Sequence, residues 1–296
     1  MFFMRKIKST LVILLIVFFV TGIPKDAKAS GGININEANY EELQKIKGIG
    51  KVIAQRIIEE RPYDSLDDLI RVKGIGKVTL EEIKNQGLAY KKVSFDGVFP
   101  AKIIDIFESS SIAYSVGEGL NKSINDFVTE KELEEVKSVE ANPEKYPVVY
   151  SLSGVQYLKN LYFLDVSDNK LRNLNGLEKI EYLQLYANNN QINDISGLKN
   201  LKFSDDLHLF NNQIDSIEYL SNLEAVNHFI LDQNNISDLS PIGKMRFIGG
   251  LCLSGNPISS FASLKTVEYF VFVSFNGQSY YNYSDLEVAF PNMTNM

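Results

Sequence analysis

Apolar residues follow two different periods along the chain, and the period changes near residue 95. Before that point they recur every three or four positions in short runs, which is typical of amphipathic helices. The run from Ile53 to Ile58 ends at Arg61–Pro62, where proline interrupts a helix. From Val149 onward, apolar positions recur every 21 or 22 residues, which indicates a repeat solenoid. The sequence therefore predicts a multidomain protein in which a small all-α domain precedes an α/β solenoid.

The helical region contains the same short segment twice. Ile46–Val52 has the sequence Ile-Lys-Gly-Ile-Gly-Lys-Val, and Val72–Val78 repeats it with Val in place of the first Ile. Asn39 and Ser65 are each followed three residues later by an acidic residue, which is the spacing of a helix capping box. Each segment is therefore expected to join two helices through a glycine hairpin.

The residue types of the hairpins suit an anion. Glycines permit backbone angles that are closed to other residues. The second glycine begins a helix, whose free N–H groups and positive dipole end favour a phosphate. The lysines add formal charge, and the isoleucine at each tip is expected to pack inward. The predicted DNA-binding residues are Lys47, Gly48, Ile49, Gly50, Lys51, Lys73, Gly74, Ile75, Gly76 and Lys77.

Residues 33 to 90 resemble the tandem helix-hairpin-helix module of competence-type DNA-uptake receptors. The resemblance includes Ile33–Ala38, Glu41–Leu43, both hairpins and Ala54–Ile58. It implies binding to the DNA backbone without sequence preference, with contacts from the four hairpin glycines. The link around Arg61–Tyr63 is shorter than is usual for the family, so the span between the hairpins is expected to differ from that of the family. The alternative is a module that serves only as a structural or protein-docking adaptor.

Charge is distributed unevenly within the net charge of −7. Residues 31–92 hold eleven Lys/Arg against ten Asp/Glu, whereas the residues after 92 hold fourteen against twenty-six. An acidic second region repels nucleic acid, so DNA contact is expected in the helical module and should be weak and sensitive to salt. The sequence contains no helix rich in Arg, Asn or Gln that is suited to reading bases, so sequence specificity is not expected.

The repeats follow the pattern Leu-x-x-Leu-x-Leu-x-x-Asn-x-Ile. The apolar positions are expected to face a shared core, and the asparagines to satisfy the backbone of neighbouring turns. The segment from Phe99 to Ala141 lacks the repeat and has helical spacing, as expected for a cap on the solenoid end. Residues 95 to 290 resemble the internalin-like family of bacterial surface proteins, whose concave strand face binds proteins. The predicted structural asparagines are Asn169, Asn190, Asn212, Asn234 and Asn256.

Aromatic and polar side chains are predicted on the outward positions of the strands, where they suggest a contact patch. The alternative is that these side chains only cover one another. His208 and His228 fall on this face near Asp206, but two histidines do not form a metal cage, so no metal site is predicted. The predicted partner-binding residues of the concave face are Phe163, Asp165, Tyr186, His208, Phe210, Ile230, Asp232 and Phe272.

The N-terminal segment has the pattern of an export signal. Basic residues precede an apolar run from Leu11 to Val20, and Ala27-Lys28-Ala29 fits a signal-peptidase site before Ser30. The run is shorter than the roughly 20 residues that a membrane-spanning helix requires. A cleaved signal peptide is therefore expected, with a retained membrane anchor as the alternative. The single Cys252 excludes an internal disulfide framework.

No Ser-His-Asp order, activated cysteine, P-loop or paired-carboxylate constellation stands out, so we expect no enzyme, no cofactor and no small-molecule substrate. The expected domains are a signal peptide (1–29), the tandem helix-hairpin-helix domain (31–92), a helical cap with an atypical first repeat (95–148) and the solenoid (149–296). The leading hypothesis is an exported DNA-binding protein, such as a competence-type DNA-uptake receptor, whose repeats recruit a protein or cell-wall partner. The alternatives are a surface adhesin with an adaptor module and a scaffold of an export or DNA-uptake machine.

Overall fold

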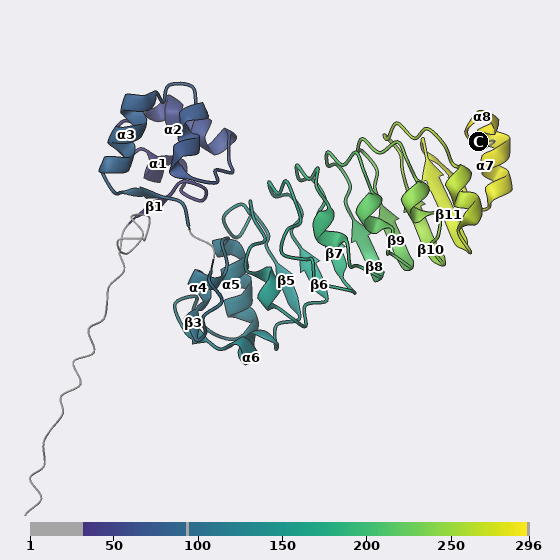
Figure 1. Cartoon of the computed structure of the whole chain (residues 1–296), viewed down its shortest axis with the longest axis horizontal. Helices are drawn as coiled ribbons and strands as arrows, with labels where there is room; N and C mark the ends of the chain where they lie inside the picture. Colours follow the sequence, from purple (N-terminus) through teal and green to yellow (C-terminus); the bar gives the residue numbers. More distant parts are fainter. Residues whose placement is uncertain (1–31, 93–94, 295–296) are drawn as a thin grey trace, which may run out of the picture.

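The computed structural model describes residues 32–92 and 95–294, so the expected signal segment lies outside the described residues. Two separate hydrophobic cores form, one from residues between 35 and 89 and one from residues between 101 and 286. Figure 1 shows a small helical module beside one end of an elongated array of strands. This arrangement agrees with the predicted fold class. In the part of the chain that is described, no helix has the length and apolar character needed to cross a membrane.

The helical module consists of two similar halves. Both capping boxes form as predicted, with Asn39 and Glu42 in the first half and Ser65 and Asp68 in the second. A two-stranded parallel sheet joins the beginning of the module to its end, with Ile33 opposite Ala89. The elements are β1 (Ile33–Asn34), α1 (Tyr40–Leu43), α2 (Lys51–Glu59), the 3-10 helix η1 (Leu66–Arg71), α3 (Lys77–Asn85) and β2 (Ala89–Tyr90).

The short link between the two halves is fixed to the beginning of the module. Arg61 is buried, and its Nε donates a hydrogen bond to the carbonyl of Ile35 at 2.7 Å. The side chain of Asn36 donates to the carbonyl of Tyr63 and accepts from its N–H, each at 2.8 Å. Buried polar groups are stable only when they are hydrogen-bonded, so these pairs explain why the link needs few residues.

The cap contains helices, as the sequence predicts, and also a small antiparallel sheet in which Ala101 pairs with Val128. Thr129 and Glu132 form a further capping box. The apolar faces of these elements pack into the same core as the repeats. The elements are β3 (Ala101–Lys102), α4 (Ile103–Ile106), α5 (Ser110–Gly119), β4 (Phe127–Val128) and α6 (Glu130–Leu133).

The repeats form one eight-stranded sheet in which neighbouring strands are parallel, except for the last pair. The first strand lies before residue 149, within the segment predicted as an atypical first repeat. Short 3-10 helices lie between most of the strands, as in η4 (Glu218–Leu220). The strands are β5 (Ser138–Glu140), β6 (Phe163–Asp165), β7 (Gln184–Tyr186), β8 (Phe203–His208), β9 (Ala225–Ile230), β10 (Phe247–Cys252), β11 (Phe270–Phe275) and β12 (Gln278–Tyr280).

The five repeat asparagines are buried and structural, as predicted. In Asn212, Oδ1 accepts a hydrogen bond from the N–H of Ile192 at 3.0 Å. Its Nδ2 donates to the carbonyls of Ala187 and Leu209, each at 3.0 Å. One side chain thereby satisfies backbone groups in its own turn and in the preceding turn, which links consecutive repeats.

The solenoid ends in a cap that the sequence did not predict. β12 folds back antiparallel on β11 and is followed by α7 (Tyr283–Ala289) and α8 (Pro291–Thr294). Phe290 packs against the rings of Phe261 and Phe275 with centroid distances of 5.3 and 5.5 Å. The cap therefore covers the apolar end of the last turn.

Candidate nucleic-acid interface and repeat surface

Both hairpins are tight turns with a glycine at the third position. The N–H of Ile49 donates to the carbonyl of Ile46 at 3.0 Å, and the N–H of Ile75 donates to the carbonyl of Val72 at 2.9 Å. Gly48 and Gly74 have φ angles of +94° and +108°, a region that favours glycine and that a type II turn requires. Ile49 and Ile75 are buried, which confirms that they pack inward.

The second glycine of each hairpin presents an uncapped helix end. Gly50 is the N-cap of α2 and Gly76 is the N-cap of α3, and neither helix has a side-chain cap. Both glycines are exposed, and no atom lies within 4 Å of the position that a Cβ would occupy. The N–H groups of the first helical turn and the positive dipole end are thus accessible to an anion.

The hairpin lysines are exposed cations. Lys47, Lys51, Lys73 and Lys77 form no ion pair with any carboxylate in the described ranges, 32–92 and 95–294. Lys84, in the same module, is paired with Asp67 and Glu81 instead. The four hairpin charges are therefore available to an external anion, and the ten predicted DNA-binding residues lie in two equivalent hairpins and at the first residues of α2 and α3.

Two residues that the sequence did not single out hold the hairpins in place. The side chain of Gln86 accepts from the N–H of Lys47 and donates to its carbonyl, and Nη1 of Arg56 donates to the carbonyl of Lys73 at 2.6 Å. Each hairpin is thus fastened by a side chain of the other half of the module. The two hairpin segments are 26 residues apart, but the residue 26 positions after Arg56 is Glu82. The internal repeat therefore did not reveal these positioning side chains.

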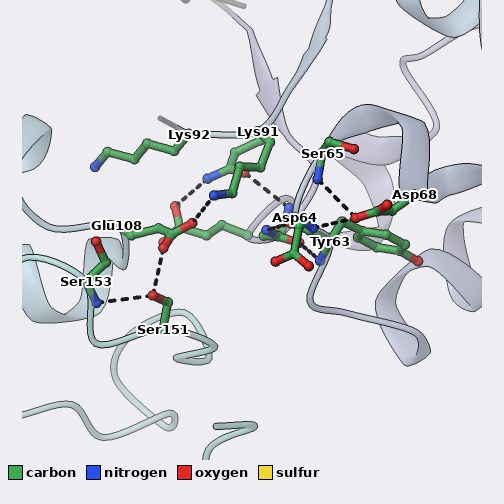
Figure 2. Close-up of polar contacts among 12 residues, drawn as sticks. Tyr63, Asp64, Ser65, Asp68, Lys91, Lys92, Glu108, Ser151 and Ser153 are labelled. Atoms are coloured by element: carbon green, nitrogen blue, oxygen red, sulfur yellow. Dashed lines mark hydrogen bonds and ion pairs between the residues drawn. The ribbon is translucent and has the colours of Figure 1, made fainter. Parts of the chain in front are cut away.

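Polar contacts also join the module to the solenoid cap. Glu37 Oε1 accepts a hydrogen bond from the N–H of Ser110 at 2.6 Å, at the beginning of α5. A carboxylate at a helix N-terminus is favourable. Figure 2 shows Lys91 beside Glu108, an ion pair of 2.9 Å, and Ser151 Oγ donates to the other oxygen of Glu108 at 2.7 Å. Sequence reasoning missed this interface because its residues are far apart along the chain.

The strand register places the predicted partner-binding residues in two neighbouring rows on the sheet. Phe163 and Phe272 lie in one row, which also contains Gln184, Asp206, His228 and Gly250. Phe210 and Asp232 lie just beyond the ends of β8 and β9. The other row contains Asp165, Tyr186, His208 and Ile230.

Asp206 is the centre of the polar part of this face. Its Oδ1 lies 2.7 Å from Nδ1 of His228 and 3.6 Å from Nε2 of His208. The Tyr186 ring packs edge-on against His208 with a centroid distance of 4.6 Å. Burial, together with the hydrogen bond to Asp206 and its negative charge, raises the pKa of Tyr186 to about 12. Burial also lowers the pKa of His208. Within the described ranges, no group of three or more His, Cys, Asp or Glu residues is arranged to hold a metal ion.

The structure therefore has the features of a protein with two binding domains, and comparisons with known proteins support this class of protein. A family model described as the helix-hairpin-helix motif matches residues 28–86. About 60% of the chain, toward its C-terminal end, is similar in fold to an internalin leucine-rich repeat structure. No curated protein matches the chain. The chain therefore combines a helix-hairpin-helix motif with an internalin-like repeat domain, and no catalytic family is identified for either part.

Three of the structural neighbours come from Listeria monocytogenes. The internalin InlF is 26% identical, with a TM-score of 0.50, over 62% of this chain and 60% of its own. Internalin C2 is 21% identical, with a TM-score of 0.39, over 62% of this chain and all of its own. A secreted internalin-like protein is 16% identical, with a TM-score of 0.43, over 62% of this chain and 69% of its own. This chain thus spans about 60% of the length of InlF.

Proposed function

We propose that this protein is an exported, non-catalytic protein that binds the DNA backbone through its two hairpins. The observation that carries the proposal is the pair of uncapped helix ends, each beginning at an exposed glycine and flanked by two lysines without a carboxylate partner among the described residues. Backbone amides and lysine charge both favour phosphate, and neither reads base identity.

In this proposal, each of the two parts of the chain that has its own hydrophobic core has its own binding function. Residues 31–92 would bind DNA, the segment 95–148 would cap the solenoid, and the repeats of 149–296 would bind a protein or cell-wall partner through the two rows described above. Their acidic balance disfavours DNA on the solenoid itself. Export rests on the N-terminal sequence pattern, and a role as a DNA-uptake receptor is the finer form of the proposal. The competing function is a surface adhesin whose helical module is an adaptor.

Fluorescence anisotropy with short labelled duplex and single-stranded DNA, at about 50 and 200 mM salt, tests the proposal. The key variant replaces Lys47, Lys51, Lys73 and Lys77 with Gln. The matched control replaces four exposed lysines outside the module, Lys137, Lys179, Lys199 and Lys244, with Gln. We expect DNA binding that weakens with salt, is lost in the hairpin variant and is unchanged in the control.

Each outcome separates the two functions. Loss of binding only in the hairpin variant would support the receptor, and each phosphate contact that is removed should lower the salt slope by about 1. If the unmodified chain does not bind DNA even at low salt, the module is an adaptor. Equal losses in the hairpin variant and the control would show that the hairpins are not the site.

A further inference from the structure

An aromatic row lies where the strands of the solenoid begin, outside the two rows described above. Tyr182 pairs with Phe203 across a parallel bridge, and Phe247 lies beside Tyr269, the residue just before β11. The rings of Phe247 and Tyr269 are stacked, with a centroid distance of 5.9 Å and an interplanar angle of 21°. Tyr182, Phe203 and Tyr269 are 38 to 58% exposed, so their faces are available to a partner.

One position in this row lacks a ring. Ala225 lies in register between Phe203 and Phe247, one strand away from each. These three residues and their charged neighbours line a cleft of about 300 Å³. Neighbouring strands are about 4.8 Å apart, so the two rings are attached at points about 10 Å apart. That gap leaves room for one flat group against an aromatic ring face, with the Ala225 methyl as the floor.

The charged residues at the rim of the cleft indicate that it favours a positively charged ligand. The positions just before the aromatic row alternate in charge along the repeats, and Glu224, Arg246 and Glu268 line the cleft. Arg246 pairs with Glu224 at 3.5 Å, and both side chains are more than 40% exposed, so that pair is weak. Glu268 forms no ion pair with any residue of the described ranges. An incoming cation can therefore pair with the carboxylate of Glu268, and it can also displace Arg246 from its weak ion pair with Glu224.

We propose that this cleft, lined by Phe203, Ala225, Phe247, Glu224, Arg246 and Glu268, binds an arginine side chain of a protein partner, which competes with Arg246 for Glu224. The inference rests on the proposed protein-binding role of the repeats. A guanidinium is flat, stacks on aromatic faces and binds carboxylates through paired N–H groups. A lysine ammonium is compact and does not fill a flat gap. The excess of acidic residues after residue 92 favours a basic partner in the same way.

The test uses the whole chain and a fluorescein-labelled Gly-Gly-Arg-Gly-Gly peptide, titrated by anisotropy or by NMR. Matching peptides replace the arginine with lysine or with citrulline, which is flat but neutral. The main variant is Ala225→Phe, which completes the aromatic row with a residue that both neighbouring strands already have at this position. Glu268→Gln removes the available carboxylate, and Glu178→Gln, elsewhere on the solenoid, is the control.

We expect the arginine peptide to bind about fivefold more tightly than the other two peptides. Ala225→Phe and Glu268→Gln should each remove this preference, and Glu178→Gln should retain it. Equal binding of the arginine and lysine peptides would show that the acidic surface attracts any cationic peptide, and it would overturn the proposal. Unchanged binding in Ala225→Phe, or no binding of the arginine peptide, would also overturn it. DNA titration of the same variants reports on the hairpins independently, so the two proposals fail separately.

Discussion

The carboxamide of Gln86 forms two hydrogen bonds with the backbone of Lys47, accepting from its N–H at 2.7 Å and donating to its carbonyl at 2.8 Å. Gln86 is the C-cap of α3, in the second half of the module, whereas Lys47 belongs to the hairpin of the first half. Arg56, in α2, fastens the second hairpin through the carbonyl of Lys73. Binding by backbone amides requires a fixed loop, so these side chains are positioning residues of the proposed DNA site.

Gln86→Ala should weaken DNA binding about threefold to tenfold, because the first hairpin loses both hydrogen bonds that fix its backbone. The salt dependence of binding should stay the same, since Gln86 itself neutralises no phosphate. Anisotropy titrations at several salt concentrations measure both quantities. Asn85→Ala, at the exposed neighbouring position, is the matched control. A lower salt slope in Gln86→Ala would instead indicate that the side chain contacts the DNA or displaces a lysine.

The two glycines of each hairpin should respond differently to alanine. Gly48 and Gly74 have positive φ angles, so alanine there should lower the free energy of unfolding by about 1–3 kcal/mol per site. Gly50 and Gly76 have φ angles of −87° and −95° and open space at the Cβ position, so alanine there should cost at most about 1 kcal/mol.

DNA binding should nevertheless fall more than about tenfold in the Gly50→Ala/Gly76→Ala double variant, because the new methyl groups project where a phosphate would approach the helix ends. Urea unfolding gives the stability and anisotropy gives the affinity. If the double variant binds DNA like the unmodified chain, these helix ends do not contact the backbone of the DNA.

The sequence predicted most of this architecture, because the features that specify it are local or periodic. Both capping boxes and the asparagine ladder follow from short spacings, such as Asn39 to Glu42. The contacts from Gln86 and Arg56 were not predicted, because they depend on how the two halves pack. The terminal helix α7 was also missed, since seven residues after the N-cap Asn282 give too short a pattern to detect.

Replacing a ladder asparagine should destabilise the solenoid far more than replacing an exposed one. Asn212→Ala leaves the buried N–H of Ile192 and the carbonyl of Ala187 without that partner, which should lower the free energy of unfolding by about 2–4 kcal/mol. Asn222→Ala removes an exposed bond to the carbonyl of Lys199 and should cost about 1 kcal/mol or less. Urea denaturation followed by circular dichroism measures both variants, and similar losses would argue against a special role of the ladder.

Stability should decrease in mild acid because of His208. Burial lowers the pKa of this imidazole below its ordinary value of 6.5, while Asp206 and Asp165 oppose the shift. The unfolded chain therefore takes up the proton first as the pH falls. The stabilisation is fully present above about pH 6.5 and is lost as the pH falls through the lower pKa of the folded state. Unfolding free energies at about pH 7.5 and 5.5 should differ less in His208→Gln than in the unmodified chain. His228→Gln, at an exposed histidine, is the control. If the difference in unfolding free energy between the two pH values decreases equally in that variant, the effect comes from the histidine pair and not from the burial of His208.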